Sequence, residues 1–180
     1  MLEQRIQQQF FDSADLKYQS AEVLARPLAE AASALYGAIT GGGKIMVAGT
    51  GPAASLARLM ATRLVSGFER ERPPLAALAV PEGEVPARHV QALGHPGDAL
   101  LLFEGGDVAA ARAAVEAAHD KEMTVVLLSA GPLLRDELAE TDVPIAIPHE
   151  RMARVLELQL LALHCLCDAI DHQLMGELDP

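Results

Sequence analysis

The sequence predicts an α/β fold, a three-layer sandwich in which a five-stranded parallel sheet is covered by helices on both faces. Apolar strands that alternate with helices are typical of parallel sheets, because each crossover places a helix on one face. The chain has 180 residues and is 51% hydrophobic, which is enough for one domain with a sizeable core. Five short apolar runs carry the strand prediction: 44–48, 75–80, 99–103, 124–128 and 143–147.

Two helices are expected before the first strand. Apolar residues recur on a helical period over 3–25, Pro27 interrupts the pattern, and a second helix is expected over 28–39. The glycine run that follows, at 41–43, is typical of a helix end. Residues 1–40 are therefore expected as an N-terminal helical extension, which oligomerisation would use because Phe10 and Phe11 need a cover.

The remaining elements follow in alternation, and residues 1–180 are expected to form one domain. The turn at 49–52 opens a helix over 53–68, because Pro52 suits the first helical turn. The last helix, over 150–175, carries leucines that point in nearly all directions, so we expect it to be buried on all sides by self-association. Three further helical stretches lie between the strands, at 85–92, 108–119 and 133–139.

Charge and cysteine usage limit the classes of partner. The formal net charge of -11 argues against direct binding of nucleic acid, which needs clustered Lys and Arg. Cys165 and Cys167 lie two residues apart on a helix, about 200° around its axis, so they do not pair easily with each other. With a polar N-terminus and no long apolar run, we expect a cytoplasmic protein that does not bind membranes.

Ligands of open parallel sheets bind beyond the carboxyl ends of the strands. The first such loop, Gly49-Thr50-Gly51, opens a helix and is a candidate site for an anion or a sugar, with Ser55 as a nearby hydroxyl. It also matches a dinucleotide fingerprint, but the acidic residue expected about 20 residues later is missing. A plain tight turn remains an alternative.

Two other places carry polar candidates. Glu104 and Gly105 follow the third strand with Asp107, where the acidic side chains disfavour phosphate and permit either a metal or a helix cap by Asp107. His164 shares a helix face with Glu157, as an acid–base pair or as a histidine packed at an interface. Two groups alone do not make a metal site, so no metal site is expected here.

Several stretches resemble one family across nearly the whole chain. The sequence is similar to bacterial phosphoheptose isomerases and to their non-enzymatic relatives of the DiaA type, which associate with the initiator DnaA. The resemblance implies a SIS (sugar isomerase) domain and a homotetramer built around helices. It is carried by Phe68-Glu-Arg-Glu-Arg-Pro-Pro74, Ala92-Leu-Gly-His-Pro-Gly-Asp98, Ala117-Ala-His-Asp-Lys-Glu-Met123 and Leu163-His-Cys-Leu-Cys-Asp168.

The resemblance also implies site residues, and this chain departs from many of them. The family's hydroxyl-rich phosphate loop falls at 104–109, which has no hydroxyl here. The family's metal-ligand positions are occupied by Leu59, Arg63, Leu156 and His164, of which only His164 retains a ligand. The segment at 81–86, which would contact substrate, is shortened.

These departures favour a non-catalytic SIS-domain regulator of the DiaA type that binds DnaA and retains weak binding of sugar derivatives. The alternatives are a phosphoheptose isomerase acting on sedoheptulose 7-phosphate, which would need zinc, and a phosphosugar sensor. No cofactor is expected in the regulator. Leu174 and Met175, at the end of the last helix, are the expected partner-binding residues. The expected ligand-binding residues are Gly49, Thr50, Gly51, Ser55, Arg63, Glu104, Gly105 and His164.

Overall fold

One parallel sheet organises the chain, and the computed structural model describes residues 1–176. The strands lie in the order β2-β1-β3-β4-β5, and every neighbouring pair is parallel. The predicted five-stranded parallel sheet is therefore confirmed. Its strands are β1 (Ile45–Gly49), β2 (Ala77–Ala79), β3 (Ala99–Phe103), β4 (Thr124–Ala130) and β5 (Val143–Ile147).

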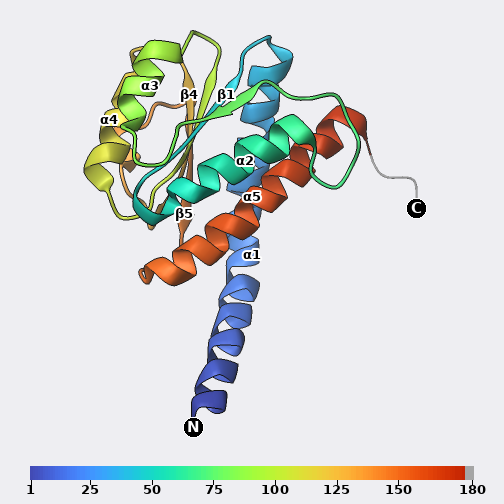
Figure 1. The fold of residues 1–180 in the computed structure, drawn as a ribbon, viewed down its shortest axis with the longest axis vertical. Coiled ribbons are helices and arrows are strands. Elements are labelled where there is room, and N and C mark those ends of the chain that lie inside the picture. Colours follow the sequence, from blue (N-terminus) through green and yellow to red (C-terminus); the bar gives the residue numbers. More distant parts are fainter. Residues whose placement is uncertain (177–180) are drawn as a thin grey trace.

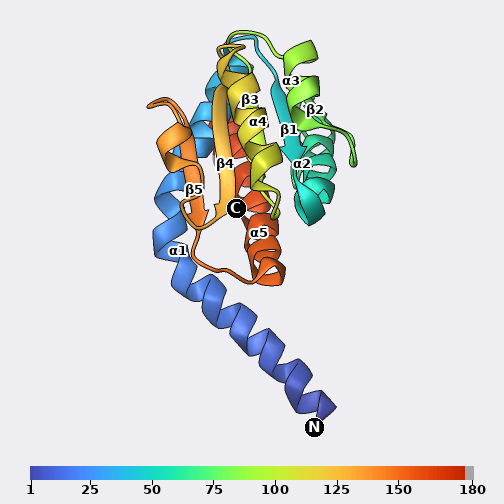
Figure 2. The same ribbon diagram turned by 90° about the vertical axis from the view of Figure 1, so that its left-hand side faces the viewer.

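Helices cover both faces of this sheet (Figures 1 and 2). The helices α1 (Leu2–Thr40), α2 (Ala54–Ser66) and α5 (Met152–Met175) pack on one face, and α3 (Pro86–Leu93) and α4 (Val108–His119) pack on the other. Side chains alternate between the two cores along β1: Val47 faces the first group of helices and Met46 the second, and both are fully buried. Burial on both faces explains why the strands are continuously apolar.

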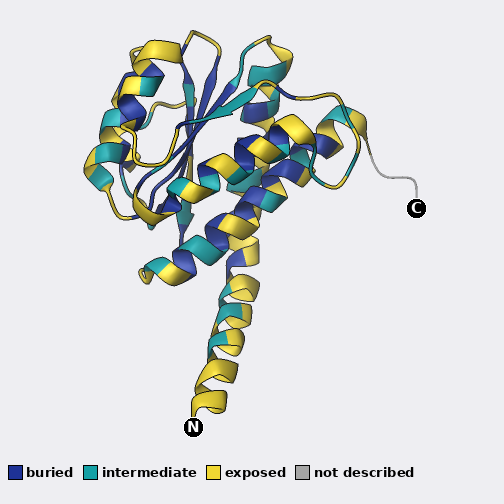
Figure 3. Ribbon diagram, viewed as in Figure 1, coloured by how far each residue is buried: buried dark blue, intermediate teal, exposed yellow. Residues whose placement is uncertain are grey.

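The N-terminal extension is one helix, so the prediction of two helices separated at Pro27 is wrong. Proline inside a helix removes one backbone hydrogen bond and usually kinks or breaks the helix. Here Leu24 before Pro27 and Leu35 after it are both buried in the same hydrophobic core, and this packing holds the two halves in one helix, α1. The first half of α1 extends away from the domain and is largely exposed (Figures 1 and 3).

Two other predicted elements are shorter in the structure. The helix expected over 133–139 is only a 3₁₀ turn, Arg135–Glu137, because Leu134 before it has a left-handed backbone (φ 56°) that an α-helix does not accept. The second strand is reduced to the three residues of β2, and the N–H of Leu75 before it donates to the carbonyl oxygen of Leu64 on α2 instead of to a neighbouring strand.

The strand order predicts a crevice at the carboxyl ends of β1 and β3. The chain goes from β1 to β2 on one side and returns to β3 on the other, so the connections diverge between β1 and β3. Ligands of open α/β sheets bind at such a point, beyond the carboxyl ends of the strands. Among the described residues, no helix has the length and hydrophobicity that a membrane span requires.

Candidate functional site

The loops that follow β1 and β3 are joined directly by Thr50 and Gly105. Thr50 donates its backbone N–H to the carbonyl oxygen of Phe103 (2.9 Å), and its hydroxyl accepts a hydrogen bond from the N–H of Gly105 (3.0 Å). A Cβ on Gly105 would lie 2.3 Å from the carbonyl oxygen of Thr50, so only glycine permits this approach. The two loops therefore form one closely packed unit at the carboxyl edge.

The side chains of Glu104 and Gln159 support the loop that follows β3. Glu104 is 1% exposed, its carboxylate accepts a hydrogen bond from the N–H of Gly106, and its own N–H donates to the carbonyl of Leu128. Gln159 on α5 donates its amide to the carbonyl oxygens of Glu104 (2.7 Å) and Leu128 (3.2 Å). The backbone N–H groups of 104–106 are thus all used within the protein, and none is free to hold a phosphate.

A pocket of about 300 Å³ opens beside this unit at the crevice between β1 and β3. Gly49, Thr50 and Gly51 line it together with carboxylates from two other loops. One of these, Asp107, accepts a hydrogen bond from the N–H of Ala110 (3.0 Å), which is the helix cap expected from the sequence. An acidic wall suits the hydroxyl groups of a sugar better than an anion. The carboxylates belong to Glu82, Glu84 and Asp107.

A second polar cluster lies between α2 and α5. The guanidinium carbon of Arg63 lies 5.9 Å from the centroid of the Phe68 ring. On α5, the ring of His164 stacks on the same Phe68 ring, with 5.3 Å between centroids and 23° between planes. Arg63, Phe68 and His164, which we name the arginine cluster, therefore form one contiguous stack.

The predicted ligand-binding residues thus divide into two groups. Gly49, Thr50, Gly51, Glu104 and Gly105 meet at the carboxyl edge. Ser55 and the arginine cluster lie along α2, where Ser55 is exposed and its hydroxyl contacts only the carbonyl of Pro52 (3.4 Å). Eight residues of helix, or about 12 Å, separate Ser55 from Arg63, so the prediction of one common pocket is not met.

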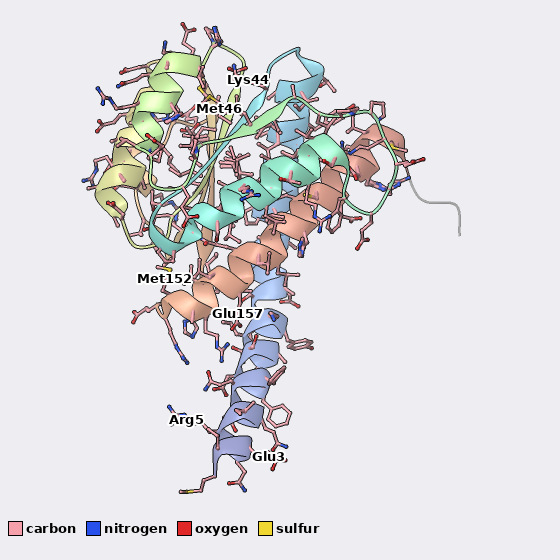
Figure 4. All side chains as sticks on the ribbon, in the orientation of Figure 1. Glu3, Arg5, Lys44, Met46, Met152 and Glu157 are labelled. Atoms are coloured by element: carbon pink, nitrogen blue, oxygen red, sulfur yellow. The ribbon has the colours of Figure 1, made fainter. Side chains whose placement is uncertain are left out.

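Glu157 does not pair with His164, contrary to the acid–base alternative. Its carboxylate accepts hydrogen bonds from Ser13 (2.6 Å) on α1 and from Arg154, and Figure 4 shows it on the side of α5 that faces α1. Burial alone would raise the pKa of Glu157, but these two partners lower it below its ordinary value. Glu157 is therefore a charged link between α1 and α5.

Zinc, which the resemblance implies for a working isomerase, does not fit the residues at the implied ligand positions. Leu59 and Leu156 have no donor atoms, and the guanidinium of Arg63 is a permanent cation that repels a metal ion. His164 alone does not provide the three or four ligands that zinc takes. Across residues 1–176, no group of three His, Cys, Asp or Glu side chains is arranged to hold a metal.

Sequence reasoning missed two residues of these sites. Phe68 was noticed only as part of a family-specific stretch, although it is the platform on which Arg63 and His164 stack. Gln159 has no expected role in the sequence analysis, although its amide donates a hydrogen bond to the loop after β3. Contacts between residues so far apart in sequence follow from the helix packing and leave no local signal.

The expected partner-binding residues lie at the end of α5. Leu174 is half-buried and packs against the core formed with α1 and α2, whereas Met175 is 45% exposed. The last four residues, 177–180, lie outside the described part of the chain. Leu174 is thus partly used within the fold, and Met175 alone presents an apolar side chain to solvent.

Comparison with known proteins identifies close relatives. Residues 9–130 match the family model described as SIS domain. A phosphoheptose isomerase from Methylibium petroleiphilum is 52% identical over 196 aligned positions, which cover 99% of this chain and 98% of the relative. A phosphoheptose isomerase from Aromatoleum aromaticum is 40% identical and covers 96% of each chain.

Solved structures agree with these relatives. The phosphoheptose isomerase from Francisella tularensis superposes with a TM-score of 0.87 and 32% identity, covering 96% of this chain and 99% of that one. The enzyme from Neisseria gonorrhoeae gives a TM-score of 0.85 and 29% identity, covering 95% of this chain and all of that one. The SIS-type fold inferred from the sequence is therefore confirmed.

These relatives contradict the expectation of a non-catalytic, DiaA-type regulator that binds DnaA. Relatives that are 52% and 40% identical, and solved structures that match almost the full chain, are named phosphoheptose isomerase. The expectation relied on single substitutions in the implied site. The similarity over the whole chain favours the alternative that the sequence left open, an isomerase.

Proposed function

The chain belongs to the SIS-domain family, and on this premise we propose that it is a sugar-phosphate isomerase of the phosphoheptose type. The observation that carries the proposal is the 52% identity to a phosphoheptose isomerase across 99% of this chain. The alignment also covers 98% of the relative, and its 196 positions exceed the 180 residues of this chain, so the relative has residues that this chain lacks. The substrate class proposed here is a phosphorylated seven-carbon sugar.

The pocket at the carboxyl edge supports the sugar part of this proposal. Its volume of about 300 Å³ is at the lower end of the range for small-molecule sites. Glu82 and Glu84 are exposed carboxylates that can accept hydrogen bonds from hydroxyl groups, and they share the pocket with the loop of Gly49, Thr50 and Gly51. These features suit a polyhydroxylated ligand.

Isomerisation between a ketose and an aldose moves a proton between two neighbouring carbons. The reaction needs a group that takes and returns this proton and a positive or hydrogen-bonding group near the developing oxygen anion. For the first role, the described residues offer the carboxylates of the edge pocket.

We also propose that the chain forms a homo-oligomer, and we expect a tetramer. An almost wholly apolar groove of about 340 Å³ lies between α1 and α5, lined by Leu24, Leu28 and Leu161 among others. The first half of α1 extends from the domain with Phe10 and Phe11 exposed to 73% and 61%. Exposed apolar patches of this kind mark interaction surfaces, so a second copy of the chain that covers α1 and the groove would stabilise both.

Exchange of a substrate proton with solvent tests the proposal. The protein is incubated in D₂O with sedoheptulose 7-phosphate, and deuterium at the first two carbons is followed by NMR together with the aldose product. We expect both deuterium incorporation and product. A control without protein gives the spontaneous rate, and the absence of both signals above that control would refute the proposal.

A further inference from the structure

The side chain of Arg63 on α2 is a half-buried cation with no counter-charge. Its Nε atom is buried without a hydrogen-bond partner, and none of its nitrogens forms a hydrogen bond or an ion pair with another residue within 1–176. Holding a charged donor away from water without a partner is unfavourable. Such a group is stabilised when an external anion binds to it.

The backbone and the ring beside it hold this guanidinium in place. The carbonyl oxygen of Arg63 accepts hydrogen bonds from the N–H of Gly67 (3.0 Å) and from the guanidinium of Arg72 (3.0 Å), which fixes the end of α2. The ring of Phe68 lies under the guanidinium and is itself stacked on His164. A charge held by a rigid support binds an anion at a lower entropic cost.

The carboxylates near the arginine cluster do not neutralise Arg63. Asp171 is paired through one oxygen with Arg72; its other oxygen is buried and unbonded, and it forms no ion pair with Arg63. Asp168, one turn after His164, is exposed and forms no ion pair among the described residues. Burial raises the pKa of the Cys167 thiol to about 12, with Asp171 acting in the same direction, so this group is uncharged at neutral pH.

The carboxyl edge, by contrast, is poorly suited to a phosphate group. The N–H groups of Glu104, Gly105 and Gly106 already donate to Leu128, to Thr50 and to the Glu104 carboxylate. The loop has no hydroxyl side chain, and the neighbouring carboxylates repel an anion. The phosphate of a sugar phosphate is therefore better placed at a different position from the edge loop.

We propose that Arg63 binds the phosphate group of a sugar phosphate, and that its guanidinium occupies the place where the family resemblance implies a metal. The guanidinium offers two parallel N–H donors to phosphate oxygens. The inference rests on the proposed function for its ligand, a sugar phosphate. It also implies that binding needs no metal, because the ligand positions carry a cation and two leucines.

Binding of a sugar phosphate that cannot isomerise tests this inference separately from turnover. The probe is glucitol 6-phosphate, titrated into chelator-treated protein with ¹⁵N-labelled arginine and followed at the Nε–Hε signal of Arg63. The signal is assigned by its loss in Arg63→Gln. We expect a saturable shift of this signal in the wild type and affinity at least about tenfold weaker in Arg63→Gln.

Arg58→Gln is the matched control, because Arg58 is exposed on the same helix and has no charged partner among the described residues. We expect it to bind the probe as the wild type does. Equal affinity in Arg63→Gln and Arg58→Gln, or no shift of the Arg63 signal in the wild type, would overturn the inference. If Arg63→Gln does not fold, Arg63→Lys assigns the signal instead, because lysine keeps the positive charge but has no Nε–Hε group, and the wild-type titration then decides the matter. If the probe binds but the protein shows no turnover, only the proposed function is refuted. If the protein shows turnover but the Arg63 signal does not shift, only this inference is refuted.

Discussion

Arg72 and Asp171 form an ion pair that is almost completely buried, with side chains exposed to 1% and 2%. Arg72 also donates to the carbonyl oxygens of Leu64 (2.8 Å) and Arg63 (3.0 Å), so it closes the C-terminus of α2 and connects it to α5. The pair therefore supports the helix end on which the arginine cluster is built.

Removing one member of this pair should be strongly destabilising. Asp171→Leu leaves the Arg72 guanidinium buried without its carboxylate, and we expect the free energy of unfolding to fall by about 3–5 kcal/mol. Urea denaturation followed by circular dichroism measures the change. Glu30→Leu is the control, since it breaks the exposed Arg26–Glu30 pair and should change stability little. Similar losses in both variants would contradict the role given to Asp171.

The close contact between the two edge loops gives a second prediction. In Thr50→Val the shape of the side chain is kept but the N–H of Gly105 loses its acceptor, so we expect a loss of about 1–3 kcal/mol in unfolding free energy. Thr50→Ser keeps the hydroxyl and should recover most of this loss. Chemical denaturation of both variants checks the difference, and a Val variant as stable as the Ser variant would show that the hydrogen bond contributes nothing.

Asp98 should make stability depend on pH. Burial raises the pKa of this carboxyl, but the hydrogen bonds from Lys44 and from the N–H of His95 outweigh it, and the net pKa is lowered from the ordinary 3.8. A lowered folded-state pKa means that the stabilisation is present above the unfolded value and is lost as pH falls through the folded value.

Asp98→Asn should therefore be less stable than the wild type near neutral pH, and the difference should shrink as pH falls below about 4. Urea midpoints measured from about pH 7 to about pH 3 test this. A difference that stays constant over the whole range would show that the charge of Asp98 does not contribute. Lys44, whose amine is paired with Asp98, lies at the start of β1 (Figure 4).

The sequence predicted the sheet because its strands are buried on both faces and are therefore continuously apolar. It failed at Pro27, where a local rule for helix breaking was outweighed by the burial of Leu24 and Leu35 in one hydrophobic core. It also failed at Leu134, because a leucine gives no indication in the sequence that its backbone is left-handed. Tertiary contacts determine the backbone structure at both positions, and a single sequence does not show these contacts.

For the candidate site, the sequence indicates which residues lie near the strand ends better than it indicates how all the candidate residues are arranged. The strand pattern places Thr50 and Gly105 at the same carboxyl edge, and the structure brings the two together. The strand pattern does not indicate that Arg63 lies about 12 Å further along α2 than Ser55. The stack on Phe68 depends on how α2 packs against α5, which no spacing in the sequence specifies.

The apolar groove between α1 and α5 predicts that assembly depends on Leu161. This side chain is 40% exposed and lines the groove. Leu161→Asp should reduce the mass in solution from a multiple of 19.1 kDa to 19.1 kDa without loss of the fold. Leu93→Asp, at a leucine that is 42% exposed on the other layer, is the control and should leave the mass unchanged. Light scattering measures both, and a monomeric wild type would contradict the proposed assembly.

The central claim is that this chain isomerises a phosphorylated seven-carbon sugar although its implied metal positions carry Leu59, Arg63 and Leu156. The most direct test is the conversion of sedoheptulose 7-phosphate by protein freed of metal with a chelator, followed by chromatography of the aldose product, with Arg63→Gln measured in parallel. The account predicts steady turnover that added zinc does not increase and that Arg63→Gln strongly reduces. No product from the wild type, with or without zinc, would contradict it.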